Sequence, residues 1–212
     1  MSVFYSLLIP VLFSYLIGSI PVGLLLGKTQ GKDIRRLGSG NIGATNVLRC
    51  LGKPLGIACF ILDVLKGFVP AFFFWRIVGG ISPDFGILFG AAAIIGHNFP
   101  VFLKFKGGKG VATSAGVLLG VAPLAVVIGL VTWIIAFKLS GYVSLGSIIA
   151  AIAVVIASWV HPNYTLAVQI ALTLLGALSI WRHRSNIVRL KNGTENRFKK
   201  GTKASGTEAQ SL

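Results

Sequence analysis

The stretch GYVSLGSIIAAIAVVIASWV, residues 141–160, contains no charged side chain. About 20 consecutive apolar residues form a helix long enough to cross the hydrocarbon core of a bilayer. Comparable stretches lie along most of the chain, in which 54% of the 212 residues are hydrophobic and only 12% are charged. This composition excludes an ordinary soluble domain. We predict an all-α integral membrane protein with a single transmembrane domain over residues 1–198 and a disordered cytoplasmic tail over residues 199–212.

The basic residues predict how the apolar segments are oriented. They gather in three connections, which run from Lys28 to Lys53, from Lys104 to Lys109, and from Arg182 onward. Connections rich in Lys and Arg usually stay in the cytoplasm. We therefore expect the first span, Val3–Gly27, to begin outside, and the next two, Pro54–Val78 and Phe85–Gly96, to cross in turn.

The stretch between residues 111 and 181 decides the number of crossings. Gly141–Val160 and Tyr164–Trp181 are two spans, and the basic C-terminal segment ends inside only if Val111–Lys138 leaves the cytoplasm and returns. Pro123 divides that stretch into two short helices. The prediction is about seven transmembrane helices, some short, with the N-terminus outside and the C-terminus in the cytoplasm. Because Val111–Ala122 would be only about 18 Å long, a re-entrant pair remains an alternative.

The segment GSGNIG, residues 38–43, matches the dinucleotide fingerprint G-x-G-x-x-G. That fingerprint needs a preceding strand, whereas the preceding residues KTQGKDIRRL are charged and do not alternate, so we reject a nucleotide site. Glycines still let backbone N–H groups approach an anion, and Arg49 offers a fork suited to phosphate. The alternative is a surface loop in which the glycines only make turns.

The segment FKGGKG, residues 105–110, resembles the end of a P-loop but lacks two of its positions. Leu103 stands where the first glycine belongs, and Gly110 stands where Ser or Thr would bind magnesium. The segment nevertheless leads directly into a helix, and a glycine-rich helix N-terminus with a lysine is a phosphate site in its own right. The alternative is a basic anchor at the lipid headgroups.

The third basic segment combines groups that could carry out chemistry. His183 could act as a general base, Asn186 as an orienting group and Glu195 as a partner for a histidine or an arginine, although interfacial arginines also serve as membrane anchors. Asp63 and Lys66 are spaced i, i+3 on the second span and can form an ion pair there. We favour a structural role for that pair, although ionisable groups within a membrane are often functional.

Several kinds of catalytic site are missing from the sequence. It has no G-x-S-x-G elbow, no paired carboxylates for sugar chemistry and no cluster of metal ligands, so we expect no metal and no cofactor. The remaining chemistry is anion binding beside lipid. This combination indicates a phosphorylated substrate and a membrane-bound product.

Three motifs in order resemble the bacterial acyl-phosphate:glycerol-3-phosphate acyltransferases, the PlsY family. They are GSGNIGATN at residues 38–46, GHNFPVFLKFKGGKGVAT at 96–113 and HRSNIVRLKNGTE at 183–195. The resemblance implies transfer of a fatty acyl group from acyl phosphate to glycerol 3-phosphate, which gives lysophosphatidate and inorganic phosphate in the first step of phospholipid synthesis. It implies a seven-helix fold in the bacterial inner membrane, with the site at the cytoplasmic face and no nucleic-acid partner. An organophosphate transporter and a non-enzymatic protein that binds anionic lipids are the alternatives.

The resemblance also implies roles for individual residues. The catalytic residues would be His183, Asn186, Glu195 and Lys109. Glycerol 3-phosphate would be bound by Ser39, Arg49, Lys109, Ser147, His183 and Asn186. Acyl phosphate would be bound by Gly38, Gly40, Asn41, Thr45, Asn46, Gly107, Gly108 and Gly110.

Overall fold

The computed structural model describes residues 3–198, which form ten α-helices and two short 3₁₀ helices and contain no strand. The predicted tail, residues 199–212, lies outside the described residues. The elements in chain order are α1 (Val3–Ser19), α2 (Val22–Lys28), η1 (Ile34–Arg36), α3 (Ala44–Leu51), α4 (Lys53–Val78), α5 (Phe85–Asn98), η2 (Val101–Leu103), α6 (Val111–Val121), α7 (Pro123–Ser140), α8 (Val143–Val160), α9 (Leu166–Arg182) and α10 (Arg184–Lys191).

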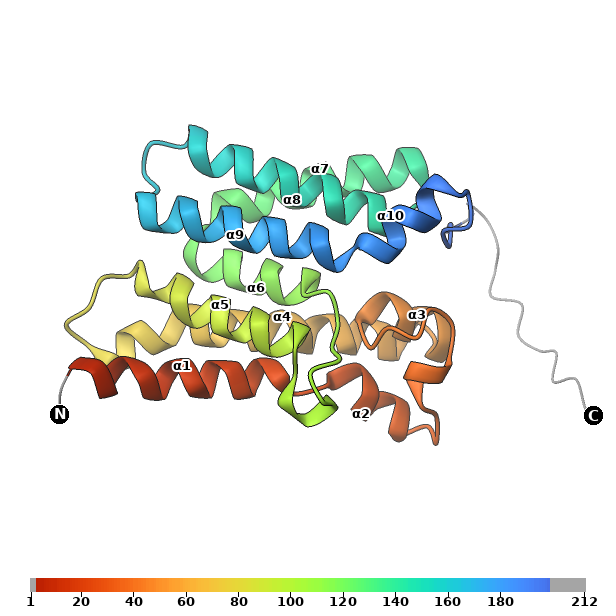
Figure 1. Cartoon of the computed structure of the whole chain (residues 1–212), viewed down its shortest axis with the longest axis horizontal. Helices are drawn as coiled ribbons and strands as arrows, with labels where there is room; N and C mark the ends of the chain where they lie inside the picture. The colour runs from red at the N-terminus through yellow and green to blue at the C-terminus, as the bar shows by residue number, and fades with distance from the viewer. Residues whose placement is uncertain (1–2, 199–212) are drawn as a thin grey trace, which may run out of the picture.

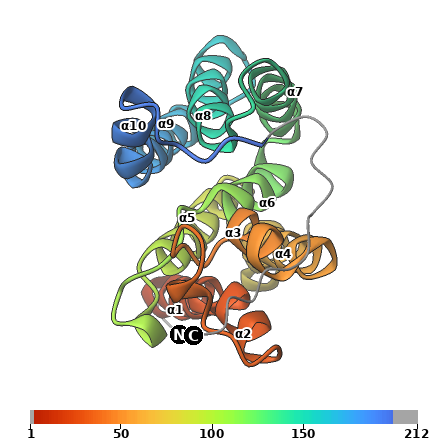
Figure 2. The ribbon, with the colours of Figure 1, turned by 90° about the vertical axis from the view of Figure 1, so that its right-hand side faces the viewer.

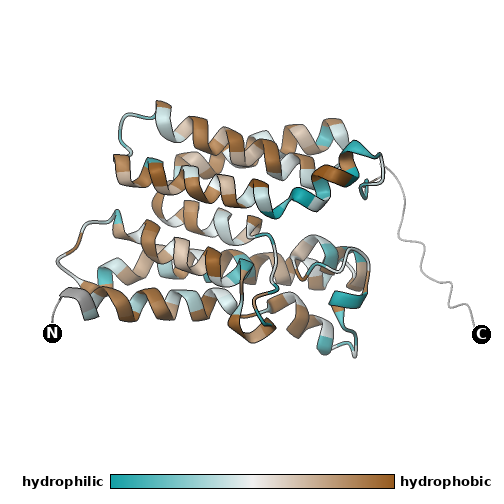
Figure 3. Ribbon diagram, in the orientation of Figure 1, coloured by the Kyte–Doolittle hydropathy of each residue, from teal (hydrophilic) through white to brown (hydrophobic). Residues whose placement is uncertain are grey.

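The long helices lie side by side, and successive ones run in opposite directions along the longest axis of the molecule (Figure 1). Seen along that axis, α1, α4 and α5 form one group, α7, α8 and α9 form another, and α6 lies between the two (Figure 2). Apolar residues dominate the middle of the helices, and hydrophilic residues are concentrated at the end that carries α2, α3 and α10, although α2 itself is mostly apolar (Figure 3). The three basic connections therefore meet at one end of the bundle.

The predicted all-helical membrane fold is confirmed, since every predicted apolar segment is helical. Five stretches are long and apolar enough to cross a membrane, when α1 is taken with α2 and α5 with η2: Tyr5–Lys28, Lys53–Val78, Phe85–Leu103, Pro123–Ser140 and Val143–Val160. The number is six if the bent pair α9–α10 counts as one span. With 11 residues, α6 is too short to belong to that set. It ends at the predicted break before Pro123, and α7 then runs in the opposite direction (Figure 1). The total of seven crossings and the orientation of the termini stay predictions.

The first predicted span is interrupted, because α1 ends at Ser19 and α2 begins at Val22, with Pro21 between them. Proline cannot donate a backbone hydrogen bond, and this leaves carbonyl groups near the break to find other partners. The side chain of Lys66 on α4 supplies one partner, since its Nζ donates to the carbonyl oxygen of Ile20 over 3.0 Å. A tertiary contact thus stabilises the break.

Glycines allow several helices to touch backbone to backbone. A Cβ atom placed on Gly18 or Gly96 would lie 2.1 or 2.2 Å from a carbonyl oxygen across the α1–α5 contact. On Gly67 or Gly116 it would lie 2.2 or 1.9 Å from one across the α4–α6 contact. Within a membrane, helix association depends on such close packing because lipid tails are as apolar as the side chains. These contacts hold α6 firmly on α4, and α6 leads from the second motif.

Candidate functional site

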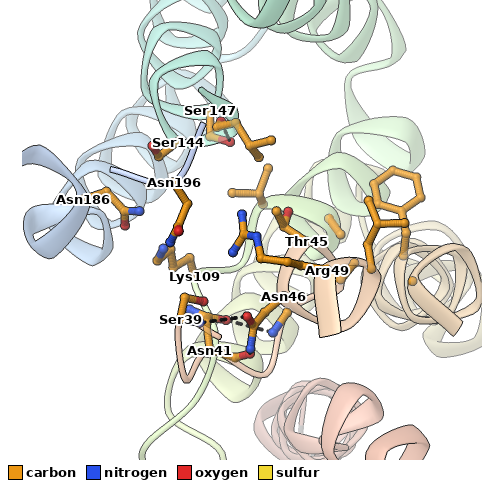
Figure 4. A pocket seen from close by; sticks show the side chains of 18 of the residues that line it. Ser39, Asn41, Thr45, Asn46, Arg49, Lys109, Ser144, Ser147, Asn186 and Asn196 are labelled. Atoms are coloured by element: carbon orange, nitrogen blue, oxygen red, sulfur yellow. Dashed lines mark hydrogen bonds between the residues drawn. The ribbon is translucent and has the colours of Figure 1, made fainter. Parts of the chain in front are cut away.

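A cavity of about 480 Å³ lies at the polar end of the bundle, where the three sequence motifs converge. Side chains from the first motif, the start of α6, α8 and α10 surround it (Figure 4). Its lining contains most of the predicted site residues, namely Ser39, Asn41, Thr45, Asn46, Arg49, Lys109, Gly110, Ser147, His183, Asn186 and Glu195. Gly38, Gly40, Gly107 and Gly108 do not line it.

Asn46 holds the first motif together from inside. Its Nδ2 lies 2.9 to 3.3 Å from three backbone carbonyl oxygens of the preceding loop, and its Oδ1 accepts the N–H of Ser39 over 2.9 Å. Gly38 and Gly40 have φ values of 55° and 68°, which favour glycine because a Cβ atom is strained there. These two glycines therefore make the turns that bring Ser39 to the cavity.

The backbone of Gly107 and Gly108 in the second motif is hydrogen-bonded on both sides. The N–H groups of Gly107 and Gly108 donate to the carbonyl oxygens of Asn98 and His97, over 3.2 and 3.1 Å. The guanidinium of Arg182 donates to the carbonyl oxygens of the same two glycines over 2.7 to 3.0 Å. Their polar backbone groups are thus engaged within the protein.

The part of this motif that faces the cavity begins one residue later. Lys109, Gly110, Val111 and Ala112 line it, and Val111 is the first residue of α6. The first N–H groups of a helix have no partner within the helix, and the helix dipole there favours an anion. The start of α6, with Lys109 beside it, is therefore suited to a phosphate.

The third motif is organised around Glu195. Its carboxylate accepts hydrogen bonds from Ser144 Oγ, Asn186 Nδ2 and Arg189 Nε over 2.8, 2.7 and 2.7 Å. Burial alone would raise the pKa of Glu195, but these three hydrogen bonds lower it below the usual value. Glu195 is thus an anion that orients its neighbours, as the sequence predicted for a partner of an arginine.

His183 lies buried between α9 and α10 and lines the cavity. Its Nδ1 lies 2.8 Å from the carbonyl oxygen of Ser179. A carbonyl oxygen only accepts hydrogen bonds, so Nδ1 carries the hydrogen and Nε2 of the neutral ring is an acceptor. The arrangement can accept a hydrogen bond from a hydroxyl group in the cavity.

Two cations in the cavity lack an acidic partner within the described residues. The guanidinium of Arg49 lies over the ring of Phe198, 5.3 Å from its centroid, and neither Arg49 nor Lys109 forms an ion pair in residues 3–198. Burial, assisted by nearby arginines and opposed by Glu195, lowers the pKa of Lys109 to about 8. Lys109 is thus a partly dehydrated cation without an acidic partner, and together with the exposed Arg49 it favours binding of a phosphate.

An apolar cavity of about 410 Å³ adjoins the polar one, enclosed by residues of α4 to α9. The two cavities share Phe60, Val111, Trp133 and Ser147 in their linings. Trp133 Nε1 donates to Ser147 Oγ over 3.3 Å at this boundary. A molecule with an anionic head and a long apolar tail would fit across it.

Sequence reasoning missed several residues of the site. Asp63 and His97 line the polar cavity, Arg182 holds the second motif, and Asn196 faces Lys109 (Figure 4). The predicted pairing of Asp63 with Lys66 is confirmed at 2.7 Å. Asn196 directly follows the motif that ends at Glu195, and only this proximity could have indicated it. Residues 3–198 contain no group of three His, Cys, Asp or Glu side chains that could hold a metal ion.

Comparisons with known proteins agree with this picture. The family model described as glycerol-3-phosphate acyltransferase matches residues 8–193. A glycerol-3-phosphate acyltransferase of Listeria monocytogenes serovar 1/2a is 48% identical over 197 residues, which cover 92% of this chain and 98% of the relative. One of Staphylococcus aureus (strain JH9) is 48% identical over 200 residues, with 91% and 98% covered.

Solved structures are similar over the same range. The crystal structure of PlsY, an integral membrane glycerol 3-phosphate acyltransferase, in its glycerol 3-phosphate form has a TM-score of 0.86 at 45% identity. Its lysophosphatidic acid form has a TM-score of 0.84 at 44% identity. Both cover 92% of this chain and 96% of the solved chain.

Proposed function

The chain belongs to the glycerol-3-phosphate acyltransferase family, and we propose that it takes the acyl group from a fatty acyl phosphate. It is a membrane-bound enzyme that acylates glycerol 3-phosphate. The proposed acceptor is the 1-hydroxyl group, and the proposed products are lysophosphatidate and inorganic phosphate. The observation that carries the proposal is the junction of a cavity with two unpaired cations and an apolar cavity of similar volume.

The polar cavity and the adjoining apolar cavity together offer a place for each proposed substrate. Glycerol 3-phosphate would bind to Ser39, Arg49, Lys109, Ser147, His183 and Asn186. The acyl-phosphate headgroup would lie at the start of α6, near Gly110 and the polar side chains of Asn41 and Thr45, with its tail in the apolar cavity. Gly38, Gly40, Asn46, Gly107 and Gly108 would contribute by shaping the loops around it, a role supported by their contacts within the protein.

The proposed reaction needs no covalent enzyme intermediate. The hydroxyl oxygen forms the new ester bond to the acyl carbon while the bond from that carbon to the phosphate oxygen breaks, and phosphate leaves with the electron pair. His183 Nε2 accepts a hydrogen bond from the hydroxyl group and orients it, and the hydroxyl proton passes to the departing phosphate. Holding both reactants in place can supply roughly 7–11 kcal/mol, and Lys109 and the start of α6 stabilise the negative charge.

Activity with purified protein tests the donor. The protein is given glycerol 3-phosphate with acyl phosphate, acyl-CoA or acylated acyl carrier protein, and lysophosphatidate and inorganic phosphate are measured. Equal amounts of the two products from acyl phosphate alone, unchanged by a chelator, are the expected result. Product formed only from acyl-CoA would show that the donor is wrong, and uptake into vesicles without product would indicate a transporter.

A histidine variant tests the proposed orienting role. His183→Ala should weaken glycerol 3-phosphate binding together with turnover. The matched control is His161→Ala, because His161 lies at the α8–α9 turn and does not line either cavity. Loss of turnover in His183→Ala with unchanged glycerol 3-phosphate affinity would instead indicate a general base.

The proposed location is the bacterial inner membrane, with the site at its cytoplasmic face. The Lys and Arg residues of the three connections at this end of the bundle support the orientation. Glycerol 3-phosphate is charged and does not cross a bilayer by itself. Inside-out vesicles should therefore be active without detergent and right-side-out vesicles only after lysis, whereas the reverse order would contradict the orientation.

A further inference from the structure

A buried ionic cluster lies beneath the polar cavity. On α4, Asp63 Oδ1 lies 2.7 Å from Lys66 Nζ, and on α5, His97 Nδ1 lies 3.7 Å from the same carboxylate oxygen. The side chains are only 2%, 6% and 4% exposed. Asp63 and His97 line the cavity, whereas Lys66 does not.

The need to neutralise the carboxylate of Asp63 explains Lys66 but not the position of His97. A buried carboxylate within a membrane protein needs a positive partner, and Lys66 supplies it. Lys66 is itself satisfied by the carbonyl oxygen of Ile20 at the α1–α2 break. The approach of His97 to Asp63 is therefore additional to the ion pair, and it is the part of the cluster that reaches the cavity.

The ring of His97 supports the second motif. A Cβ atom placed on Gly108 would lie 2.1 Å from His97 Nε2, so the backbone of Gly108 packs directly on the imidazole. The carbonyl oxygen of His97 also accepts the N–H of Gly108. A carboxylate near Nδ1 favours the ring orientation in which Nδ1–H faces Asp63 and Nε2 faces Gly108. At 3.7 Å the contact is longer than a hydrogen bond, and it is the charge of Asp63 that favours this orientation of the ring on which the loop rests.

The position of this loop determines where the cationic wall of the cavity lies. Gly108 is followed by Lys109 and then by Gly110, which precedes the first turn of α6. Arg182 holds the other side of the loop, through the carbonyl oxygens of Gly107 and Gly108. A shift of the imidazole would move Lys109 relative to the anion, and displacements near 1 Å at a reacting centre can reduce rates about 100-fold.

We propose that Asp63 is a positioning residue for the phosphate-binding wall formed by Lys109 and the start of α6, and that it acts through His97. The identity of the phosphate as that of acyl phosphate rests on the proposed function. The positioning of an anion site by Asp63 does not, and a direct binding measurement tests it separately.

Three variants separate positioning from the stability of the ion pair. Asp63→Asn removes the charge that faces both partners, Lys66→Met removes only the structural partner, and the double variant leaves no unpaired buried charge. Breaking a buried pair destabilises strongly, whereas replacing both members is often nearly neutral. Lys66→Met is the matched control because it keeps the Asp63–His97 contact.

The first measurement is thermal unfolding in detergent with saturating glycerol 3-phosphate, with and without inorganic phosphate. Phosphate should raise the Tm of the wild type and of Lys66→Met. Its effect should be largely lost in Asp63→Asn and in the double variant, even where the Tm without phosphate recovers in the double variant. Recovery of the phosphate effect in the double variant, or its equal loss in all three, would overturn the proposal.

The second measurement is steady-state kinetics. The KM for acyl phosphate should rise about tenfold or more in Asp63→Asn and the double variant. The KM for glycerol 3-phosphate should rise less, because Lys109 is only one of the six residues proposed to bind it. Asp63→Asn should add nothing further in a His97→Gln background, and additive effects would exclude action through His97. If the wild type does not use acyl phosphate, the proposed donor is wrong, and the phosphate-dependent change in Tm still decides the role of Asp63.

Discussion

Lys109 makes the pH dependence of the enzyme predictable. In the proposed site the protonated amine binds phosphate, and burial at the cavity lowers the pKa of Lys109 from 10.5 to about 8. For a group with that pKa, roughly 90% is protonated at pH 7 and roughly 9% at pH 9. We therefore expect kcat/KM for acyl phosphate to fall about tenfold between pH 7 and pH 9.

The two kinetic constants should respond differently. The pH dependence of kcat/KM reports the free enzyme, and that of kcat reports the enzyme with substrate bound. A bound phosphate dianion favours the protonated amine, so the decline of kcat should begin at a higher pH than that of kcat/KM. Phosphate monoesters lose their second proton near pH 6, so glycerol 3-phosphate does not titrate in this range.

Initial rates of lysophosphatidate formation between pH 6.5 and 9.5 provide the assay, with spontaneous hydrolysis of acyl phosphate subtracted. Lys109→Arg is the matched control, because arginine stays protonated throughout. The kcat/KM of Lys109→Arg for acyl phosphate should be lower than that of the wild type but should not decline between pH 7 and pH 9. A wild-type kcat/KM that stays constant to pH 9.5, or an unchanged alkaline decline in Lys109→Arg, would refute the reasoning.

Three further substitutions follow from the packing and the hydrogen bonds. Gly116→Ala should destabilise the protein by about 1–3 kcal/mol in thermal unfolding, because a Cβ there would lie 1.9 Å from a carbonyl oxygen of α4. Gly120→Ala is its control and should change stability far less, because a Cβ at Gly120 would lie 3.2 Å from its nearest neighbour, the Cβ atom of Ala71. Asn46→Ala should accelerate hydrogen exchange in the loop before α3, above all at Ser39, since it removes the acceptor of the Ser39 N–H and three side-chain hydrogen bonds to loop carbonyl groups. Arg182→Lys should raise the KM for acyl phosphate more than that for glycerol 3-phosphate, because lysine cannot hold two loop carbonyl groups with a planar fork.

Much of the helical plan could be predicted because hydropathy acts locally. Pro123 was correctly read as a break, yet Pro10 and Pro70 lie inside α1 and α4 without ending them, and Pro21 separates α1 from α2. Proline in an apolar segment is tolerated wherever neighbouring groups satisfy the freed carbonyls. At Pro21, Lys66 from another helix contributes, and its position depends on tertiary packing.

In the site, too, the sequence predicted which segments meet but not which atoms contact one another. The motifs were expected to share one membrane face, and the structure brings them to one cavity. The partners of individual N–H groups were not predictable, because the carbonyl oxygens that engage Gly107 and Gly108 belong to the end of α5. Likewise, Asp63 meets His97 only through the register of α4 on α5.

The four residues shared by the two cavities have a consequence for product exit. Phe60, Val111, Trp133 and Ser147 mark the level at which a polar environment gives way to an apolar one. Each methylene group contributes about 0.8 kcal/mol when it is removed from water, so release of the lipid product into water would slow about fourfold per methylene. Release into lipid carries no such penalty, because the interior of the bilayer is as apolar as the apolar cavity. We therefore expect the lipid product to leave the apolar cavity into the surrounding bilayer. Its residence time on the enzyme then depends on how easily it reaches the bilayer from that cavity.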